Sequence, residues 1–587
     1  MRCPVQVENT RRILCVFPAY TPAFGTFAHA FPLLYKVRAF MPPQGLLLIA
    51  AYLPEQWPVR FVDENVARAK PEDFAWADVV MVSGMHVQAP QIREIVERAH
   101  VAGKAVVLGG PSVSAAPEMY PGIDYLHLGE VGDATDALVA HLDRDVSRPG
   151  AQVQFKTNDR LPLGDFPIPG YHHVRLGNYL IGSIQFSSGC PYQCEFCDIP
   201  GLYGRQPRLK APEQIIAELD AMMSQPSRPQ TVYFVDDNFI GNKKAARDLL
   251  PHLVEWQKRH QYPLTFACEA TLNISKLPEV LKLMQDASFV NIFVGIETPE
   301  VDALKHMRKD HNATLPMMES INTLNSYGME ITSGIILGLD TDNADSADRL
   351  IEFIEQSKIP LLTINILQAL PKTPLWDRLA RDNRIVDDPK LESNVRFLRP
   401  YDEVIAAWRR CIAHAYEPER LFDRFYHQVE RTYVNRKNPS GRGKLTFANL
   451  RQGAVLAWRL FTHIGLKSDY RQHYWRAAKH ALKHGQFDAV MGMGFVAHHL
   501  IKFTREALQG EQNASFYSTH ERAVSDVRAQ SAGASLVPFA VPPGEEHGHA
   551  GQPVVPRGQS QTSGSVRQPE DFGPAGRKAD AYRVRTG

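Results

Sequence analysis

Three cysteines, Cys190, Cys194 and Cys197, lie in the run Ser-Gly-Cys-Pro-Tyr-Gln-Cys-Glu-Phe-Cys, with the spacing C-x3-C-x2-C. Three thiolates this close together can each bind one iron of a [4Fe–4S] cluster and leave the fourth iron without a protein ligand. Gly189 before the first cysteine and Pro191 after it favour a tight loop. An open iron can bind a substrate, so the pattern predicts a cluster that does chemistry as well as carrying electrons.

Other uses of the triplet are less well supported. A structural zinc site needs a fourth Cys or His, usually in a second pair, and the next cysteine, Cys268, is distant and lies in an apolar run. Seven cysteines in 587 residues are sparse and odd in number, which argues against a disulfide framework. We interpret Cys3, Cys15, Cys268 and Cys411 as ordinary buried or near-terminal thiols.

Composition and charge narrow the class of protein. The chain is 44% hydrophobic and 22% charged with a net charge of +1, as expected of a soluble protein of several domains without affinity for nucleic acid. The first twelve residues are too polar for a secretory signal, and no apolar run is long enough to span a bilayer. Few cysteines and an oxygen-sensitive cluster predict a reducing cytoplasm.

Residues 1–145 alternate between short apolar runs and helical stretches. This pattern predicts a parallel, doubly wound, Rossmann-like α/β domain. The expected strands are 13–17, 59–62, 79–83, 105–108 and 125–128, and the expected helices are 45–53, 90–102 and 133–142.

Ligands of such sheets bind at the carboxyl ends of the strands. The candidate binding residues there are Ser83, Gly84, Gly109, Gly110, Ser112, Gly129 and Glu130. No G-x-G-x-x-G follows the first strand, so a nicotinamide or flavin dinucleotide is not supported. A flavodoxin-like scaffold without a cofactor is the alternative.

Residues 146–180 are rich in proline and glycine and are predicted to be a linker between domains. From 181 to 400 the alternation resumes as six βα units, which predicts a partial (β/α)6 barrel with active residues at the carboxyl ends of its strands. The expected strands are 183–187, 231–235, 265–268, 291–294, 332–337 and 362–368.

Acidic residues follow three of these strands. Asp236 lies in Val-Asp-Asp-Asn-Phe after the second strand, Glu269 follows the third, and Glu297 lies in Gly-Ile-Glu-Thr-Pro after the fourth. At the mouth of a barrel their carboxylates can bind a cofactor or substrate. Capping of the next helix is the alternative for Asp236.

Residues 401–507 are predicted to be helical and basic. From Arg431 to Lys483 there are twelve Lys and Arg residues, opposed in that stretch only by Asp469 and interleaved with aromatic side chains such as Trp458 and Trp475. This surface could lie on an anionic membrane, or it could be the solvated face of a helical cap. Residues 508–587 are rich in Ser, Gly, Pro and Gln and are predicted to be disordered.

The cysteine motif, with Phe196 before its last cysteine and the ordered segments after it, resembles the radical S-adenosylmethionine (SAM) superfamily. The first domain, with Pro-Pro-Gln-Gly-Leu at residues 42–46, resembles the cobalamin-binding domain that precedes many of its members. The resemblance implies that Phe196, Asp236, Glu269 and Glu297 lie around the cluster and SAM.

The motif D-x-H-x-x-G, which supplies a histidine to cobalt in other cobalamin proteins, is absent. Asp124 and His127 have the wrong spacing. The resemblance therefore implies cobalt held without a protein imidazole. His86, at a strand end, is placed where it could approach the cofactor, but we expect it to make ordinary hydrogen bonds.

From about residue 12 to 507 the chain resembles the hopanoid C-2 methylase group, on runs such as Phe-Val-Asp-Glu-Asn at 61–65 and Val-Ser-Gly-Met-His-Val-Gln at 82–88. The resemblance implies that an electron donor reduces the cluster and that SAM cleavage generates a 5′-deoxyadenosyl radical. That radical would activate an sp3 carbon of a polycyclic lipid, which then receives a methyl group from cobalamin. Alternatives are an enzyme that methylates, cyclises or rearranges another natural product, and a non-enzymatic cobalamin sensor.

Overall fold

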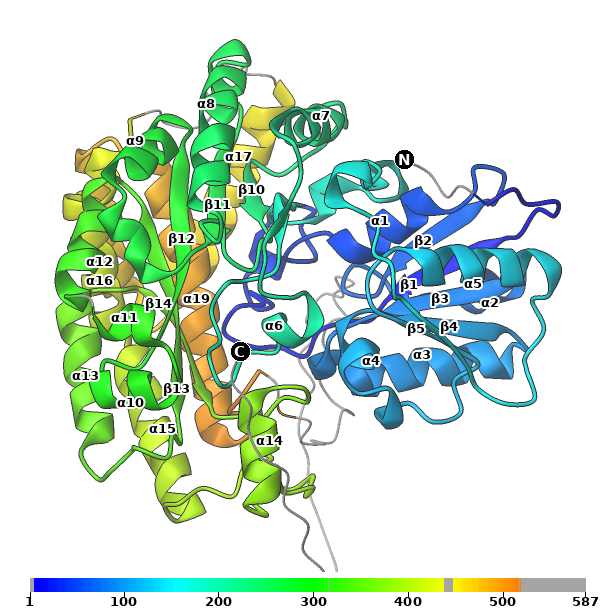
Figure 1. Ribbon diagram of the computed structural model, residues 1–587. Coiled ribbons are helices and arrows are strands. Elements are labelled where there is room, and N and C mark those ends of the chain that lie inside the picture. The colour runs from blue at the N-terminus through cyan, green and yellow to red at the C-terminus, as the bar shows by residue number, and fades with distance from the viewer. Residues whose placement is uncertain (1–4, 315, 438–446, 517, 519–587) are drawn as a thin grey trace, which may run out of the picture. The chain divides into compact units, whose positions relative to one another are not determined.

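The computed structural model describes residues 5–314, 316–437, 447–516 and 518, and these lie in one compact unit, Met1–Ala523. The first domain contains a six-stranded sheet of order β2-β1-β3-β4-β5-β6 in which all neighbours are parallel (Figure 1). Its strands are β1 (Ile13–Phe17), β2 (Val59–Asp63), β3 (Val79–Ser83), β4 (Ala105–Gly109), β5 (Tyr125–Leu128) and β6 (Val153–Lys156). Its helices are α1 (Gln44–Tyr52), α2 (Pro71–Trp76), α3 (Ala89–Val101), α4 (Pro111–Ala115) and α5 (Asp133–Arg144).

Successive residues of the central strands feed two separate cores, one on each face of this sheet. Leu14 and Val80 belong to the core that includes Ile92 of α3, whereas Ile13 and Met81 belong to the core that includes Leu138 of α5. Because both faces are covered, these strands are continuously apolar rather than alternating. The strand order reverses between β1 and β3, which makes the loops after these two strands the expected ligand site of the domain.

Strand β6 lies inside the segment that the sequence assigned to a linker. It pairs with β5 at the edge of the sheet, from Tyr125↔Val153 to Leu128↔Lys156. Its four residues alternate between half-buried and exposed positions, so the segment lacks the apolar run that marked the central strands.

The second sheet is also parallel, with the order β14-β13-β12-β11-β10-β7. Its strands are β7 (Gly182–Ile184), β10 (Thr231–Phe234), β11 (Thr265–Glu269), β12 (Phe289–Glu297), β13 (Glu330–Leu337) and β14 (Leu361–Ile366). The associated helices are α6 (Ile199–Leu202), α7 (Pro212–Met223), α8 (Lys243–Arg259), α9 (Pro278–Asp286), α10 (Val301–His306), α11 (Asp310–Ala313), α12 (Met317–Ser326), α13 (Ser346–Ser357) and α14 (Pro374–Arg381).

Six parallel strands in chain order, each followed by at least one helix, make the partial barrel that the sequence predicted. A short antiparallel pair, β8 (Ser187–Ser188) and β9 (Arg208–Leu209), brackets the cysteine loop. The predicted fold class, a Rossmann-like domain followed by a partial barrel and a helical region, is confirmed.

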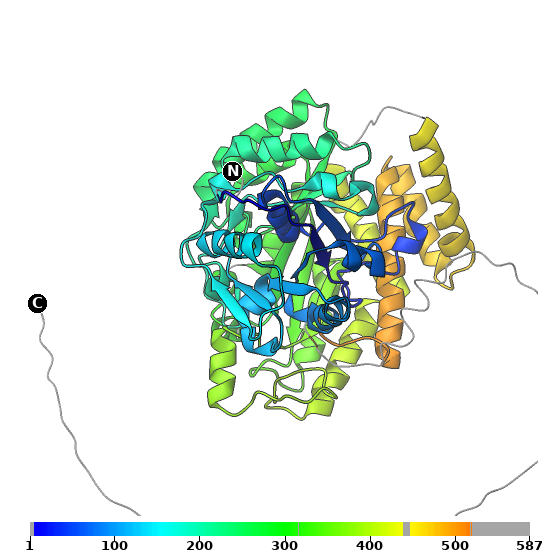
Figure 2. The ribbon, with the colours of Figure 1, turned by 90° about the vertical axis from the view of Figure 1, so that its right-hand side faces the viewer.

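The helical region packs against the barrel (Figures 1 and 2). It consists of α15 (Tyr401–Ala415), α16 (Pro418–Arg431), α17 (Phe447–Leu460), the π-helical turn η9 (Phe461–Leu466), α18 (Arg471–Lys483) and α19 (Phe487–Gln509). Within the described ranges, no helix combines the length and apolarity that a membrane crossing requires.

The first residues of the predicted disordered tail are ordered against the barrel. The backbone N–H of Ile366, the last residue of β14, donates to the carbonyl of Ala514, and the N–H of Phe516 donates to Asn365 Oδ1. The Phe516 ring also lies 6.3 Å from the ring of Tyr20, in the loop after β1. The polar composition of the segment conceals these contacts, because most of them are made by the backbone. The remainder of the tail, from 519, lies outside the described residues.

Candidate active site

The cysteine loop leaves the barrel after β7 and is held from behind by two aspartates that follow β10. Asp236 Oδ1 accepts hydrogen bonds from the backbone N–H groups of Phe186 and Ser187, and Asp237 Oδ2 accepts one from Gly189 N–H at 2.7 Å. Gly189 has φ = 97°, in the left-handed region that favours glycine. The acidic pair after β10 therefore fixes the turn that leads into Cys190.

The other end of the loop is anchored by a network of charges around the buried Glu195. Arg378 of α14 donates to both oxygens of Glu195, at 2.5 and 3.0 Å, and to Asp340 Oδ2 at 2.6 Å. Arg384 also contacts Asp340. The backbone N–H of Leu375 donates to the Glu195 carbonyl, so α14 and the middle of the cysteine loop are joined through main chain and side chain together.

A buried ion pair between Lys309 and Glu297 lies close to the thiols. Lys309 donates to Glu297 Oε1 at 2.6 Å, and its Nζ lies 5.5 Å from the centre of the Phe196 ring. Both charged side chains are at least nine-tenths buried. Glu297 was predicted to contact a cofactor, and the structure shows its carboxylate paired with Lys309.

The three thiols interact electrostatically with one another and with Lys309. Burial raises the pKa of all three, to about 11 for Cys194, and Lys309 acts in the opposite direction on Cys190 and Cys194. Asn238 Nδ2 also lies 4.0 Å from Cys190 Sγ. Buried thiols become thiolates readily only when a metal takes the place of the proton, which fits a cluster site.

Among the described residues, no group of three or more His, Cys, Asp or Glu side chains converges on a single metal ion. This finding is compatible with the cysteine triplet, because each thiolate of a [4Fe–4S] site binds a different iron. It does not favour the mononuclear zinc alternative.

A group of buried acids lies at the carboxyl ends of β10 and β11. Burial, reinforced by repulsion from neighbouring acids of this group, raises the pKa of Asp236 and Glu269 to about 7. Burial, reinforced by Glu130 and Asp198, raises the pKa of Asp237 to about 6. Tyr233 OH donates to Glu269 Oε1 at 3.3 Å, while Asp236 Oδ2 is buried without a hydrogen-bond partner in the part of the chain described. Such a group favours a cationic ligand.

At the carboxyl edge of the first sheet, beside the switch point, the predicted binding residue Ser112 lies in a buried polar chain just after β4. Ser112 is fully buried and its hydroxyl contacts His86 Nδ1 at 3.1 Å and Tyr120 OH at 2.5 Å. Burial lowers the pKa of His86 to about 4, so the ring is neutral, and its Nε2 has no partner among the described atoms. His86 therefore makes the hydrogen bond expected of it and keeps one free ring nitrogen.

The glycines at this edge are needed for packing. Gly110 has φ = 94°, and a Cβ there would lie 2.5 Å from Ser83 Oγ and 3.1 Å from the nitrogen of Gly84. The loops after β3 and β4 can approach each other only because of this glycine. Gly109, the last residue of β4, and Gly129, which follows β5, complete the predicted set at this edge.

Hydrogen bonds and an ion pair join the carboxyl edges of the two sheets. Glu130, after β5, forms an ion pair with Arg208 of β9 and accepts from Ser188 Oγ at 3.3 Å, two residues before Cys190. Lys372, beyond β14, donates to the carbonyl of Ser114 in α4. The cysteine loop and the ligand edge of the first domain are thus neighbours, and the polar groups of Glu130 are used in holding them together.

The structure also accounts for the mis-spaced Asp124 and His127 motif and for the cysteines outside the triplet. Asp124 is paired with His100 and Arg148, and His127 Nε2 contacts Thr135 Oγ1, so both residues of the mis-spaced motif serve the fold. Cys15, Cys268 and Cys411 are buried free thiols, as expected, whereas Cys3 lies outside the described residues.

Sequence reasoning missed several residues of this site. Glu195 and Asp237 lay inside the quoted motifs and could have been singled out as buried acids beside the cysteine loop. Lys309, Arg378 and the strap at 514–516, the tail segment that contacts the end of β14, had no such signal, because they come from distant parts of the chain.

Models of three protein families match the chain. The Radical SAM superfamily matches residues 184–354, the B12 binding domain matches 32–139, and a domain of unknown function (DUF4070) matches 373–513. The first two matches imply a [4Fe–4S] cluster, SAM and cobalamin as the cofactors of the protein.

Relatives and solved structures agree with these two family matches. The chain is 58% identical over 515 residues to a hopanoid C-2 methylase of Rhodopseudomonas palustris (strain TIE-1), covering 88% of this chain and 98% of the relative. It shares its fold with the radical SAM methyltransferase TsrM from Kitasatospora setae, solved with cobalamin and a [4Fe–4S] cluster (TM-score 0.51, 16% identity, 81% of this chain and 100% of that one). The cobalamin-dependent radical SAM enzyme OxsB is similar (TM-score 0.52, 13% identity, 87% and 83%). The chain therefore belongs to the hopanoid C-2 methylase family of cobalamin-dependent radical SAM methyltransferases.

Proposed function

We propose that this enzyme methylates C-2 of a hopanoid, an unactivated sp3 carbon of a polycyclic lipid. The observation that carries the proposal is the 58% identity to a hopanoid C-2 methylase along nearly the whole of both chains. The contacts of Glu130 with Arg208 and Ser188 support it, because they bring the ligand edge of the B12-binding domain beside the cysteine loop.

We assign the cluster to Cys190, Cys194 and Cys197, and cobalamin to the switch point around Ser83, Gly84 and Ser112. Bound there, the cluster supplies the electron that cleaves SAM, and cobalamin supplies the methyl group. The protein's own part is to hold both sites and exclude water. Asp236 and Asp237 fix the loop, Arg378 and Glu195 anchor it, and Phe196 packs beside Lys309.

The acids after β10 and β11 fit the remaining cofactor, since SAM carries a positive sulfonium and a positive ammonium group. We assign this attraction to Asp236, Asp237 and Glu269 rather than to Glu297, whose charge is balanced by Lys309. Only the ionised carboxylates attract a cation.

We expect SAM affinity to rise with pH between 6 and 8, because Glu269 and Asp236, with pKa values raised to about 7, lose their protons in that range. Glu269→Gln should weaken binding by about tenfold at pH 8 and make the pH dependence shallower. The measurement is calorimetric titration of SAM into the reconstituted enzyme.

Glu330→Gln is the matched control, because Glu330 is a half-buried acid at the amino end of β13, away from the carboxyl ends of β10 and β11, and accepts from Tyr433. This variant should leave both the affinity for SAM and the pH dependence of that affinity unchanged. A pH-independent affinity in the wild type would refute the assignment of these acids to SAM.

The substrate is tested in a hopanoid-producing strain whose own C-2 methylase has been deleted. Expression of this chain should restore hopanoids that are heavier by one methyl group, with fragmentation that places it at C-2. Mass spectrometry of the lipid extract is the measurement, and the Cys194→Ala chain is the negative control. A methyl group on another carbon, or an unmethylated rearranged product, would instead favour the alternative of a different natural-product reaction.

A cobalamin sensor without activity is the weaker candidate, because the chain is 58% identical to a hopanoid C-2 methylase over nearly its whole length. We further propose that the enzyme works in the reducing cytoplasm with a separate electron donor, and that it meets its lipid as a peripheral protein at the inner face of the membrane. The polycyclic lipid substrate supports the membrane contact, because such a molecule resides in a bilayer.

A further inference from the structure

The helical region carries a surface that the reaction does not use. Five of the ten large apolar side chains exposed in the described chain fall within residues 458–487, although that stretch is only thirty residues long. They are Trp458, Phe461, Leu466, Leu482 and Phe487, and Trp458 is 66% exposed. An apolar group so concentrated on a monomer marks an interaction site.

Aromatic contacts make part of this group continuous. The rings of Trp458 and Phe461 lie 6.2 Å apart, and Phe461 is edge-on to Trp475 at 6.1 Å. The Trp475 indole donates to the carbonyl of Gly465 at 2.9 Å, and a Cβ on Gly465 would lie 2.7 Å from that ring. The chain of rings thus runs from α17 across η9 to α18.

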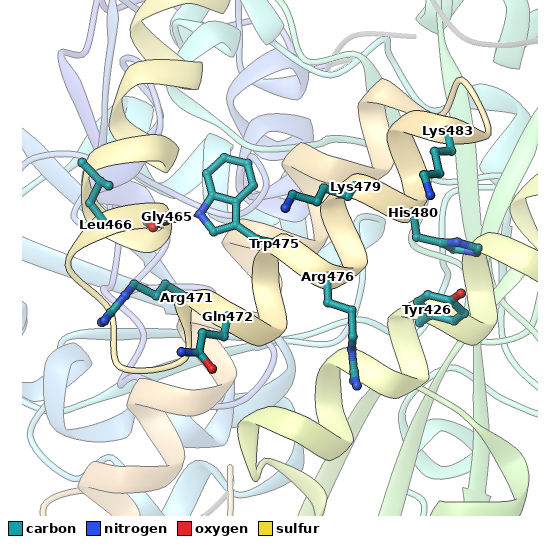
Figure 3. A pocket seen from close by; sticks show the side chains of 10 residues that line it. All are labelled: Tyr426, Gly465, Leu466, Arg471, Gln472, Trp475, Arg476, Lys479, His480 and Lys483. Carbon is teal, nitrogen blue, oxygen red and sulfur yellow. Dashed lines mark hydrogen bonds between the residues drawn. The ribbon is translucent and has the colours of Figure 1, made fainter.

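Trp475 also lines an open pocket of about 950 Å³ (Figure 3). Its walls include Arg471, Arg476, Lys479 and Lys483 of α18, and Leu466 of η9. Figure 3 shows Trp475 between Gly465 and Lys479. Spacings of four residues place Arg471, Trp475, Lys479 and Lys483 along one side of the helix. We call Trp458, Phe461, Leu466, Arg471, Trp475, Lys479 and Lys483 the basic-aromatic face.

The nearby acids are paired with cations outside this face. Arg476 is paired with Asp423 of α16, and Asp469 is paired with Arg505. Among the described residues, Arg471, Lys479 and Lys483 have no carboxylate within ion-pair distance, whereas the buried side of α18, which includes Tyr474, Ala477 and Ala481, packs into the main core. The cations therefore face outward beside the apolar side chains.

We propose that the basic-aromatic face docks the enzyme on an anionic phospholipid bilayer, with headgroup phosphates at Arg471, Lys479 and Lys483 and with Trp458 and Leu466 inserted between the headgroups. Exposed Trp and Leu next to unpaired Lys and Arg are the combination that interfacial helices use, and a solvated cap has no need for the apolar half. The inference deepens the proposed function, because docking gives the enzyme access to a lipid substrate, but binding to vesicles can be measured without any substrate.

The test is flotation of the full-length chain with vesicles of phosphatidylcholine containing phosphatidylglycerol, compared with phosphatidylcholine alone. We expect binding to the anionic vesicles that falls with added salt. Lys479→Glu/Lys483→Glu should reduce it by roughly tenfold or more, and Leu466→Ser should reduce it to a smaller extent. Lys243→Glu/Lys244→Glu, on the exposed start of α8, and Leu398→Ser, at a 66% exposed leucine, are the matched controls and should bind like the wild type.

Methylation of detergent-dispersed hopanoid separates this inference from the proposed function. The α18 variant should retain that activity and lose methylation of vesicle-borne hopanoid. Equal binding of wild type and the α18 variant, equal losses in the control variants, or saturation by inorganic phosphate without vesicle binding would each overturn the docking proposal. If the wild type bound vesicles but methylated neither detergent-dispersed nor vesicle-borne hopanoid, only the proposal that hopanoid is the substrate would be overturned.

Discussion

Cys194→Ala should abolish reductive cleavage of SAM, with 5′-deoxyadenosine falling to the level seen without reductant. Cys194 is the middle residue of the triplet, and removing its thiolate leaves two ligands for a cluster that needs three. Chromatography of the anaerobic reaction gives the product, and iron and sulfide analysis gives the cluster content. The variant should still bind cobalamin, because the switch-point residues around Ser112 belong to the first domain.

Cys268→Ala is the matched control. Cys268 is a fully buried thiol on β11 that belongs to the barrel core, and its loss should leave the iron content and SAM cleavage intact. If Cys194→Ala retained the cluster and cleaved SAM, the assignment of the three ligands would be wrong. If it lost cobalamin as well, the two sites would depend on each other more strongly than their separate domains imply.

Arg378→Met should destabilise the site almost as severely, although residue 378 lies far from the cysteines in sequence. The substitution leaves Glu195, with an 8% exposed side chain, without its cation and removes one of the two arginines on Asp340. Removing one partner of a fully buried pair costs about 3–5 kcal/mol, and because the Arg378 side chain is 25% exposed the expected loss here is at the lower end, about 3 kcal/mol. We expect the free energy of unfolding to fall by about that amount and iron incorporation to drop sharply, as measured by denaturant titration and iron analysis.

Arg381→Met tests whether the effect comes from the ion pair rather than from α14 itself. Arg381 lies on the same helix, is exposed, and within the described part of the chain its side chain donates only to the carbonyl of Asp377 one turn earlier. This variant should be as stable as the wild type and carry a full cluster. Glu195→Gln/Arg378→Met, which removes both charges, should recover part of the lost stability, and no recovery would argue against the buried-charge explanation.

The two sheets could be predicted from the sequence because their strands are short apolar runs between helices. The central strands of the first sheet fill a core on both sides, whereas in β13 of the barrel buried residues alternate with half-buried ones. The edge strand β6 was not predicted, since half of its four residues face solvent. The order of the strap at 514–516 was not predicted either, because its hydrogen bonds to β14 come largely from the backbone and leave no pattern of side chains in the sequence.

The cysteine triplet was evident from sequence because its three ligands lie within one loop, and local spacing is enough to define them. What surrounds them was decided by the tertiary structure. Lys309, Arg378 and Glu130 reach the loop from other elements, and only the fold shows that Glu297 is paired with Lys309 while Glu269 lies among other acids. Local chemistry is encoded by neighbours in the chain, whereas the charge balance of a buried site depends on which distant side chains folding brings together.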